Sequence, residues 1–245
     1  FLETLRQIGD DLALVAAATT SFVSGHETIA ALNDGSSPAH SDDKSRGAYG
    51  NWPRSGTQWV EYAWSRPIAT DGIEVYWFDD RRGVRLPKAC RLLSWDGSSW
   101  SAVAGAKGLG LEENRFNATT FPEVKTTRLR LEIDSDGRSS TGILEWRVWD
   151  SGASPNFPPT VEAGTDRVVV MPGRTYLSGF VRDDGKAKPA SVSWSKASGP
   201  GDATIEDPSA ASTAARFSAP GEYVLRLTAD DGESTASDSV RVTVE

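Results

Sequence analysis

The sequence contains very little cysteine and histidine, the residues on which thiol chemistry and zinc sites most often depend. Its 245 residues include a single cysteine, Cys90, which excludes an internal disulfide and a cysteine-based zinc site. We expect Cys90 to be a small buried residue of a strand. The two histidines, His26 and His40, lie in separate segments. The composition therefore gives little support to a catalytic triad or a zinc centre.

The sequence also lacks long hydrophobic runs and blocks of basic residues. The longest apolar run, Leu12–Ala18, is much shorter than the roughly 20 residues that cross a bilayer. The formal net charge is −8, whereas a nucleic-acid partner needs a basic face to neutralise its phosphates. We therefore expect neither a nucleic-acid partner nor membrane insertion.

Tryptophan is distributed unevenly along the chain. Eight of the nine tryptophans fall between Trp52 and Trp149. The composition changes at DSGASPNFPPT, Asp150–Thr160, whose proline, glycine and serine content favours an extended linker. This predicts two domains, residues 11–150 and 160–245, joined by a linker of residues 151–159. Residues 1–10 have apolar residues at helical spacing and start without a methionine or a signal region, so we expect a lead-in from an upstream module.

Hydrophobic residues recur with a period of two in both predicted domains, as in half-buried strands. The inward sets are Val60, Tyr62 and Trp64 in one run, Ile73, Val75 and Trp77 in another, Leu129, Leu131 and Ile133 in a third, and Val240, Val242 and Val244 in a fourth. Asp-Gly pairs, which supply the positive φ of tight turns, separate such runs. These pairs begin at Asp34, Asp71, Asp96, Asp136, Asp184 and Asp231. Four tryptophans in strand-like runs are expected in the core: Trp59, Trp64, Trp77 and Trp146.

A charged stretch, YWFDDRRGVRLP, runs from Tyr76 to Pro87 and joins two predicted strands. Residues 79–85 must form the intervening loop, with Gly83 allowing the bend. Its acids and arginines either pair with one another as a solvated cluster of small effect on stability, or bind a ligand. Asp79 and Asp80 are not a glycosidase pair, because neighbouring side chains of an extended chain point to opposite sides. No nucleophile elbow, phosphate loop or zinc motif is present, so we expect no enzymatic activity in this chain.

The order of motifs from Asp11 to Asp150 resembles a discoidin-type domain, as in coagulation-factor C domains and many bacterial carbohydrate-binding modules. The motifs are LALVAAATTSF, ALNDGSSP, TQWVEYAWSRPIATDGIEVYWF, RLLSWDGSSW, TTRLRLEI and GILEWRVW. GILEWRVWDSG and the YWFDD and GVRLPKACRLL segments are similar to C-terminal modules of large secreted bacterial glycosidases, including beta-L-arabinofuranosidase-like enzymes. The resemblance implies an eight-stranded jelly-roll sandwich with ligand-binding loops at one end, in which LALVAAATTSF is the first strand.

This resemblance also implies a structural calcium ion near the first long loop. Calcium takes six to eight oxygen ligands, several of them backbone carbonyls. By resemblance, the ligands are the carbonyl groups of Leu32, Ser36 and Leu144, the hydroxyl of Ser37, and the carboxylates of Asp34 and Glu145. Glu145 shares its predicted strand face with Ile143, and a buried carboxylate without a cation or partner is costly. The alternative is an ordinary Asn-Asp-Gly turn with Glu145 hydrogen-bonded inside the sandwich.

A sugar site in the loops is a further implication of the resemblance. In sugar-binding modules of this kind the loop after the Ile73–Phe78 strand provides an acid and an arginine, and an earlier loop provides a histidine or an aromatic. Carried over, the acid is Asp79 or Asp80, the arginine is Arg82 or Arg85, the histidine is His40, and Tyr49 and Trp52 are stacking platforms. Carboxylates and guanidinium groups bind sugar hydroxyls, and aromatic rings pack on the C–H face of the sugar.

The segment Thr160–Glu245 resembles the polycystic-kidney-disease-type immunoglobulin-like repeat. The motifs that carry the resemblance are TYLSGFVRDDG, VSWSKASGPG, ARFSAPGEYVLRLTADDG and DSVRVTVE. The resemblance implies about seven short strands around a core tryptophan, Trp194, with Phe217, Tyr223, Leu225 and Leu227 on the opposing sheet. Such repeats act as spacers between modules, and we expect simple turns rather than a site at the two Asp-Asp-Gly segments.

These observations predict an all-β protein, a discoidin-type jelly-roll sandwich followed by an immunoglobulin-like β-sandwich. The predicted function is that of a non-catalytic carbohydrate-binding and spacer region of a secreted bacterial glycoside hydrolase. It would act outside the cytoplasm, at the cell surface or in the periplasm, and keep an upstream catalytic domain near a polysaccharide. The alternative is structural: residues 79–85 pack against the parent enzyme and bind no free sugar. Composition does not separate the two, because arginine and aromatic residues are also enriched at protein interfaces.

Overall fold

The computed structural model describes residues 10–106 and 109–245 of the protein. The predicted lead-in therefore lies outside the described residues, except for Asp10. The chain divides into two compact units, Phe1–Pro155 and Asn156–Glu245. The division falls within the stretch that the sequence predicts to be a linker, residues 151–159. Within the described ranges, no helix is long and apolar enough to cross a bilayer.

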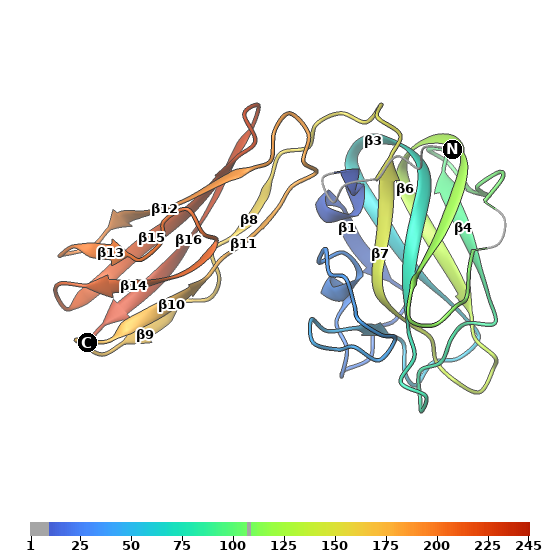
Figure 1. Ribbon diagram of the computed structural model, residues 1–245, viewed down its shortest axis with the longest axis horizontal. Coiled ribbons are helices and arrows are strands. Elements are labelled where there is room, and N and C mark those ends of the chain that lie inside the picture. Colours follow the sequence, from blue (N-terminus) through green and yellow to red (C-terminus); the bar gives the residue numbers. More distant parts are fainter. Residues whose placement is uncertain (1–9, 107–108) are drawn as a thin grey trace. The chain divides into compact units, whose positions relative to one another are not determined.

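The first unit is an all-β sandwich. Its strands are β1 (Ala17–Thr20), β2 (Tyr49–Gly50), β3 (Thr57–Phe78), β4 (Ala89–Trp95), β5 (Trp100–Ala102), β6 (Phe116–Asp134) and β7 (Gly142–Asp150). The hydrogen-bonded order is β2-β7-β3-β6-β4-β5, with β1 also paired to β3 (Figure 1). The described part of this unit thus has seven strands where the resemblance implied eight.

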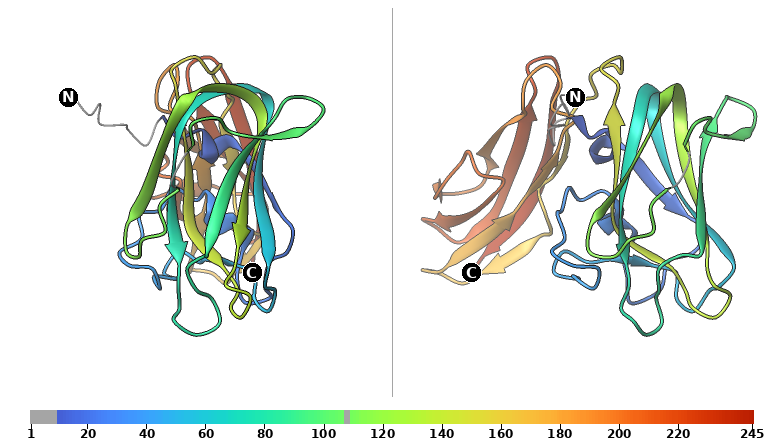
Figure 2. Two further views of the ribbon diagram at one scale, coloured as in Figure 1. Left: turned by 90° about the vertical axis from the view of Figure 1, so that its right-hand side faces the viewer. Right: turned by 45° about the vertical axis from the view of Figure 1, so that its right-hand side comes forward.

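Two long antiparallel strands, β3 and β6, connect the two layers of the sandwich. The first part of β3 pairs with β1 and with the end of β6, and the second part pairs with β7 and with the start of β6. The register shifts between Ala63 and Ile68 and again between Thr70 and Gly72. Figure 2 shows the two strands curving over one end of the unit. Because each strand continues through both layers, fewer separate strands are needed to close the sandwich.

One predicted strand begins instead as a helical turn. The segment Leu12–Val15 forms a 3-10 helix, η2, and β1 is limited to Ala17–Thr20. The cause is Asp11, whose Oδ1 accepts a hydrogen bond from the backbone N–H of Ala13 at 3.0 Å, as a helix N-cap does. The same oxygen accepts a bond from the Val148 N–H at 2.9 Å, which ties this turn to β7. A second 3-10 helix, η3 (Ile29–Leu32), leads into the predicted calcium loop.

Five of the six Asp-Gly pairs place their glycine at positive φ, as predicted: Gly35, Gly97, Gly137, Gly185 and Gly232. The prediction of a turn at Asp71-Gly72 is wrong. These two residues lie inside β3, at the second register shift. The pair therefore marks a bulge in a continuous strand and not its end, and bulges of this kind increase the local bend and twist of a strand.

The core of the first unit follows the predicted alternation. Val60, Tyr62, Leu129, Leu131 and Ile133 are each fully buried. The ring of Tyr62 stacks on that of Trp146 with centroids 4.2 Å apart. Phe78 and its neighbours are buried as well, in a second cluster that comprises Ala48, Tyr76, Phe78, Val84 and Leu144. Both faces of the end of β3 are therefore covered.

Cys90 lies in β4, half-buried opposite Ile133 of β6. Burial raises the pKa of its thiol to about 12, with a contribution from the nearby Asp134 carboxylate. A thiol with so high a pKa is almost entirely protonated at neutral pH, and the thiolate is the reactive form. The structural interpretation of Cys90 therefore stands.

The prediction of a core position is right for Trp64, Trp77 and Trp146 and wrong for Trp59. Trp59 lies on the outer face of the sheet, where the Arg130 guanidinium is 4.3 Å from its ring centroid and 4.4 Å from that of Trp100. Beneath them Glu61, 1% exposed, accepts hydrogen bonds from Arg128 Nε at 2.7 Å and from Arg130 at 2.8 Å. Indole rings and guanidinium groups thus cover a buried carboxylate on this face.

The second unit, all of whose residues are described, is a β-sandwich of nine strands where about seven were expected. They are β8 (Thr160–Glu162), β9 (Arg167–Val169), β10 (Arg174–Ser178), β11 (Phe180–Arg182), β12 (Ser191–Ser198), β13 (Ala203–Ile205), β14 (Ser212–Phe217), β15 (Gly221–Asp230) and β16 (Thr235–Val244). One sheet has the order β12-β15-β16-β9 and another β10-β14-β13, while β8 pairs with β11.

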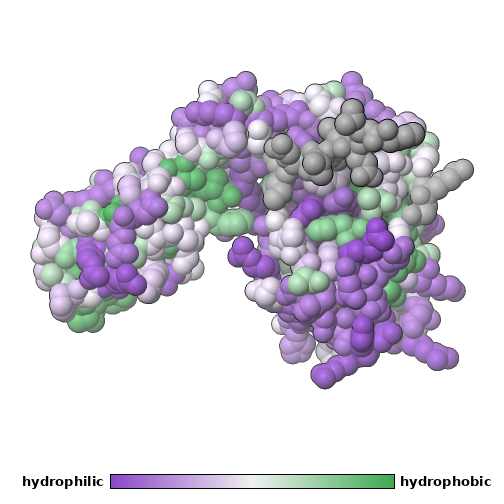
Figure 3. All heavy atoms as spheres, in the orientation of Figure 1, coloured by the Kyte–Doolittle hydropathy of each residue, from purple (hydrophilic) through white to green (hydrophobic). Residues whose placement is uncertain are grey.

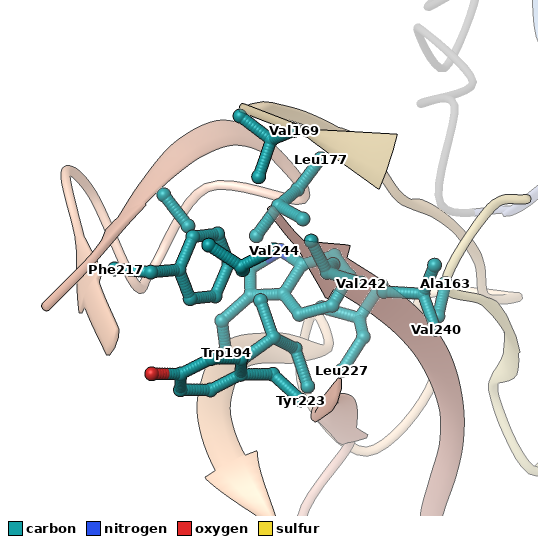
Figure 4. Close-up of a cluster of buried hydrophobic side chains, with 12 residues drawn as sticks. Ala163, Val169, Leu177, Trp194, Phe217, Tyr223, Leu227, Val240, Val242 and Val244 are labelled. Atoms are coloured by element: carbon teal, nitrogen blue, oxygen red, sulfur yellow. The ribbon is translucent and has the colours of Figure 1, made fainter. Parts of the chain in front are cut away.

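Trp194 is buried in the core of the second unit, as predicted (Figure 4). Its indole N–H donates to the Ala211 carbonyl at 3.0 Å. Phe217 belongs to β14 in the opposing sheet, as expected. The same expectation is wrong for Tyr223, Leu225 and Leu227. They belong to β15, which pairs directly with the strand of Trp194 and lies in the same sheet.

Candidate functional site

Asp79, the first aspartate of the charged loop after β3, stabilises that loop through hydrogen bonds to its backbone. Asp79 is 3% exposed, and its carboxylate accepts hydrogen bonds from the backbone N–H groups of Arg81 at 2.7 Å and Leu86 at 3.2 Å. The Nε atom of Arg85 lies 3.6 Å from the same carboxylate. Both carboxylate oxygens of Asp79 are therefore occupied within the loop. Of the two acids predicted to bind sugar, only Asp80 has a free oxygen for a ligand.

Asp80 shapes the tip of the loop through one oxygen only. Its Oδ1 accepts hydrogen bonds from the backbone N–H groups of Arg82 at 2.8 Å and Val84 at 3.0 Å. Arg81 pairs with Glu113, at 3.1 Å, and not with the neighbouring acids. The described contacts thus differ in part from the predicted salt-bridge cluster: the aspartates bind backbone N–H groups and Arg81 pairs outside the loop, while Arg85 lies beside Asp79.

Three loops form a pocket of about 300 Å³ at the end of the sandwich that carries this loop. Its lining residues are Ser24, His26, Glu27, Trp52, Asp80, Gly83 and Val84. The Trp52 side chain is 47% exposed, which is unusual for so large a hydrophobic residue, and its ring centroid is 6.1 Å from that of His26. On the side drawn in Figure 3, the surface of the first unit is predominantly hydrophilic, with small hydrophobic areas.

The position of Trp52 is fixed by its neighbours in the chain and in space. The preceding residue, Asn51, is buried and exchanges two hydrogen bonds with Thr141, Nδ2 to Oγ1 at 2.7 Å and Thr141 N–H to Oδ1 at 2.9 Å. On the other side the indole lies against Gly83. A Cβ on that glycine would be 3.0 Å from Trp52 Cδ1, so the absence of a side chain allows this close approach.

A mostly buried carboxylate, that of Glu27, is among the lining residues of the pocket. Its side chain is 8% exposed, and its Oε1 pairs with Lys44 Nζ at 3.1 Å. Its Oε2 is buried and has no hydrogen-bond partner. Gly50 lies next to this group, since a Cβ there would be 3.2 Å from Glu27 Cγ. A buried carboxylate oxygen without a donor is a site at which a ligand hydroxyl or a water molecule is stabilising.

The structure brings together some of the predicted sugar-binding residues and separates others. Trp52 and Asp80 both line the pocket, whereas Arg82 and Arg85 of the same loop do not. His40 lies outside it and pairs with Asp42 at 2.5 Å. The prediction of Tyr49 as a stacking platform is wrong, because Tyr49 is fully buried and its hydroxyl donates to the Phe22 carbonyl at 3.1 Å.

Sequence reasoning missed three lining residues that precede the predicted calcium loop: Ser24, His26 and Glu27. They belong to VSGHET, a polar, glycine-containing segment between two apolar stretches, which is a recognisable loop signal. The backbone N–H of Ser24 donates to the Gly50 carbonyl at 2.8 Å and places this loop beside β2. The histidine of the pocket is thus His26 and not His40.

The predicted calcium loop meets Glu145 of β7. The backbone N–H and the hydroxyl of Ser36 donate to Glu145 Oε2 at 3.0 and 3.1 Å. Glu145 is fully buried, and its Oε1 has no hydrogen-bond partner. Burial, together with the nearby carboxylates of Asp11 and Asp34, raises the pKa of this carboxyl to about 9. This charge distribution favours either a proton or a cation beside Glu145.

The other predicted calcium ligands already accept or make hydrogen bonds. The Leu32 carbonyl accepts from the Tyr62 hydroxyl at 2.7 Å, and the Ser36 carbonyl accepts from Arg147 at 2.8 Å. The same Arg147 nitrogen lies 2.9 Å from Ser37 Oγ. Within the described residues there is no group of three or more His, Cys, Asp or Glu side chains that could hold a metal ion.

Two of the predicted ligands nevertheless fit a cation. Asp34 and Glu145 approach each other across the loop, and Glu145 has a carboxylate oxygen that no donor satisfies. Calcium takes several of its ligands from backbone carbonyls, so a calcium site does not need a third carboxylate. The carbonyl group of the buried Leu144 is one of the predicted ligands. The residues are thus compatible with a calcium site built on two carboxylates.

Comparison with known proteins gives a family-model match within the second unit and several solved structures of similar fold. The family model described as "K319L-like, PKD domain" matches residues 163–244. A chain of the Streptococcus pneumoniae beta-galactosidase BgaA is similar to this chain with 18% identity and a TM-score of 0.50, covering 56% of this chain and 93% of that chain.

Two further similar structures are carbohydrate-binding modules. The family 32 module from C. perfringens NanJ, in complex with galactose, has 13% identity and a TM-score of 0.46 and covers 56% of this chain and 96% of its own. A pectin-binding module has 19% identity and a TM-score of 0.41 and covers 58% of this chain and 94% of its own. These findings show a β-sandwich fold shared with the BgaA chain and a match of residues 163–244 to a PKD-domain model.

Proposed function

We propose that the first unit is a non-catalytic carbohydrate-binding module and that the pocket beside Trp52 receives a sugar ring. The observation that supports this most directly is a half-exposed indole standing beside the carboxylates of Asp80 and Glu27. A volume of about 300 Å³ is at the lower end of the roughly 300–1,000 Å³ of small-molecule pockets, which suits one sugar ring better than several.

Each lining side chain has a role suited to a sugar. The Trp52 ring offers a flat apolar surface to the C–H face of the ring, where aromatic contacts bury area with little loss of side-chain entropy. Asp80 Oδ2 accepts a hydrogen bond from a sugar hydroxyl while its Oδ1 stays bound to the loop backbone. His26 beside Trp52 supplies a second polar edge. Because the pocket is small and open, a single site should bind weakly.

We infer that the whole chain is an accessory region of a secreted bacterial glycoside hydrolase. The sandwich of the first unit is shared with a chain from a beta-galactosidase, and the PKD-like second unit would act as a spacer. Binding of a polysaccharide would raise the effective concentration of substrate near an attached catalytic domain. This role needs no catalytic residues in the chain itself, and it is performed outside the cytoplasm.

Titration calorimetry of the whole chain against a panel of neutral, amino and acidic mono- and oligosaccharides tests this proposal. We expect saturable binding of at least one sugar, and we expect Trp52→Ala to weaken it. Trp95→Ala is the matched control, because Trp95 lies on the outer sheet face beside Arg128 and does not line the pocket. No binding across the panel would contradict the proposal and favour the alternative, in which residues 79–85 pack against a parent enzyme.

We also propose that Asp34 and Glu145 hold a structural calcium ion, together with carbonyl groups of Leu32, Ser36 and Leu144 and the hydroxyl of Ser37. The support is the buried, unsatisfied Oε1 of Glu145. A bound cation would balance the carboxylates and tie the early loop to β7. Thermal unfolding with added calcium and with a chelator tests this, and we expect calcium to raise the melting temperature of the wild type but not of Glu145→Gln. Equal melting temperatures for the wild type in both conditions would contradict it.

A further inference from the structure

The charges around the pocket are unevenly distributed. Two carboxylates, those of Glu27 and Asp80, line it, and its lining among the described residues includes no arginine or lysine. Of the three arginines at the loop tip, Arg81 is directed to Glu113 and Arg85 to Asp79. The loop that carries most of the positive charge in this part of the sequence therefore presents acceptors, not cations, to the pocket.

Glu27 and Asp80 share one property: one oxygen of each carboxylate is bound to protein groups, and the other accepts no hydrogen bond from the described residues. Oε1 of Glu27 pairs with Lys44, and Oε2 is buried without a partner. Oδ1 of Asp80 accepts two backbone N–H groups, and those are the hydrogen bonds that fix the loop. A ligand in the pocket can therefore donate a hydrogen bond to Asp80, whereas the buried Glu27 oxygen acts on the ligand through its negative charge.

The Lys44 side chain is a cation in direct contact with one of these carboxylates. It is 43% exposed and contacts only one oxygen of Glu27, and its Nζ lies 5.2 Å from the ring centroid of Phe78. Glu27, Asp80 and Lys44 together carry one net negative charge. A ligand carboxylate would approach two like charges at short range in a partly desolvated pocket, where such repulsion is stronger than in water. A ligand hydroxyl or ammonium group would instead donate a hydrogen bond to Asp80, and an ammonium group would also be attracted by the charge of Glu27.

We infer that the pocket selects its ligand by charge: it accepts neutral or amino sugars and rejects uronic acids, and Glu27 is the residue that sets this selectivity. The inference rests on the proposed sugar-binding function and deepens it by naming the sugar class. Trp52 contributes equally to all three classes, since stacking on the C–H face is independent of the substituent charge. Selectivity must therefore come from the carboxylates.

Three matched methyl glycosides in each of the gluco and galacto series test the inference by calorimetry of the whole chain at about pH 6. They are the neutral sugar, its uronic acid and its 2-amino derivative. Within the series that binds, we expect the uronic acid to bind at least tenfold more weakly than the neutral sugar, and the amino sugar at least as tightly. Raising the salt concentration should narrow these differences, because it screens charge.

Two variants separate a role in selectivity from a structural role. Glu27→Gln keeps the shape of the side chain and removes its charge, so it should narrow the gap between neutral and acidic sugars. Lys44→Met removes the compensating cation, so it should widen that gap. If Glu27 only supports the loop, both variants will change affinity for all sugars alike, and the selectivity inference is wrong.

The outcomes distinguish this inference from the proposed function. Equal binding of a neutral sugar and its uronic acid would overturn the inference and leave the carbohydrate-binding function intact. Tight uronic-acid binding that is lost in Arg82→Ala would also overturn it and would place the exposed Arg82 guanidinium in the site. Failure of every sugar to bind would overturn the proposed function and the inference together.

Discussion

Replacing Trp52 with alanine is expected to weaken sugar binding about tenfold. The Trp52 side chain is 47% exposed, and a fully exposed tryptophan presents roughly 250 Å². About 120 Å² is then open to a ligand, of which a sugar ring covers about half. At about 25 cal/mol per Å², burial of roughly 60 Å² contributes about 1.5 kcal/mol, or a factor of about ten in Kd.

The assay is calorimetric titration of the wild type, Trp52→Ala and Trp52→Phe with the tightest-binding sugar of the panel. Phenylalanine keeps a smaller ring, so its affinity should fall between the other two. The melting temperature should change little, because a half-exposed side chain contributes little to the core. A Trp52→Ala variant that binds as well as the wild type, while Trp95→Ala does not, would refute the reasoning.

Three further predictions concern the surroundings of the site. Gly83→Ala places a Cβ 3.0 Å from Trp52 Cδ1, so it should displace the indole and lower sugar affinity several-fold at an unchanged melting temperature; unchanged affinity would show that the ring position is unimportant. Glu61→Ala leaves the guanidinium groups of Arg128 and Arg130 without their buried counter-ion. Because both arginines are partly exposed, the free energy of unfolding should fall by about 2 kcal/mol, which calorimetric unfolding should show as a decrease of roughly 6 °C in Tm. A Tm within about 1 °C of the wild type would contradict this prediction. In calcium-free buffer the folded state keeps a proton on Glu145, whose pKa is raised from 4.5 to about 9, while the unfolded chain releases it above about pH 4.5. The free energy of unfolding should therefore fall as the pH rises from about 4.5 to about 9, and Glu145→Gln should flatten this dependence. A wild-type stability that increases over the same pH range would contradict the raised pKa of Glu145.

The fold could be predicted wherever a strand is buried on one face, because alternation then identifies the inward residues. Leu129, Leu131 and Ile133 are examples. Prediction failed where a side chain and the backbone compete. Asp11 caps a 3-10 turn in a segment of strand-like composition. Trp59 was assigned to the core because it lies in a strand-like run, although its own alternation with Val60 places it on the outer face.

The candidate site could be predicted only in part, because a resemblance carries over residue types and not their surroundings. It drew attention to Trp52 and Asp80, which line one pocket. It could not show that Asp79 has both oxygens bound to its own loop, or that Tyr49 is buried. It also could not show that a second loop brings Glu27 to the pocket, since this depends on backbone pairing between Ser24 and Gly50.

The central claim is that a sugar binds beside Trp52, and nitrogen-edited NMR of the labelled chain tests it most directly. The nine tryptophans give separate indole N–H signals, and each can be assigned by substitution. On titration with a sugar we expect the Trp52 indole and the backbone amides of His26 and Gly83 to shift together and to saturate at one Kd. Shifts confined to the outer-face indoles of Trp59, Trp95 and Trp100, with the Trp52 signal unmoved, would contradict the account.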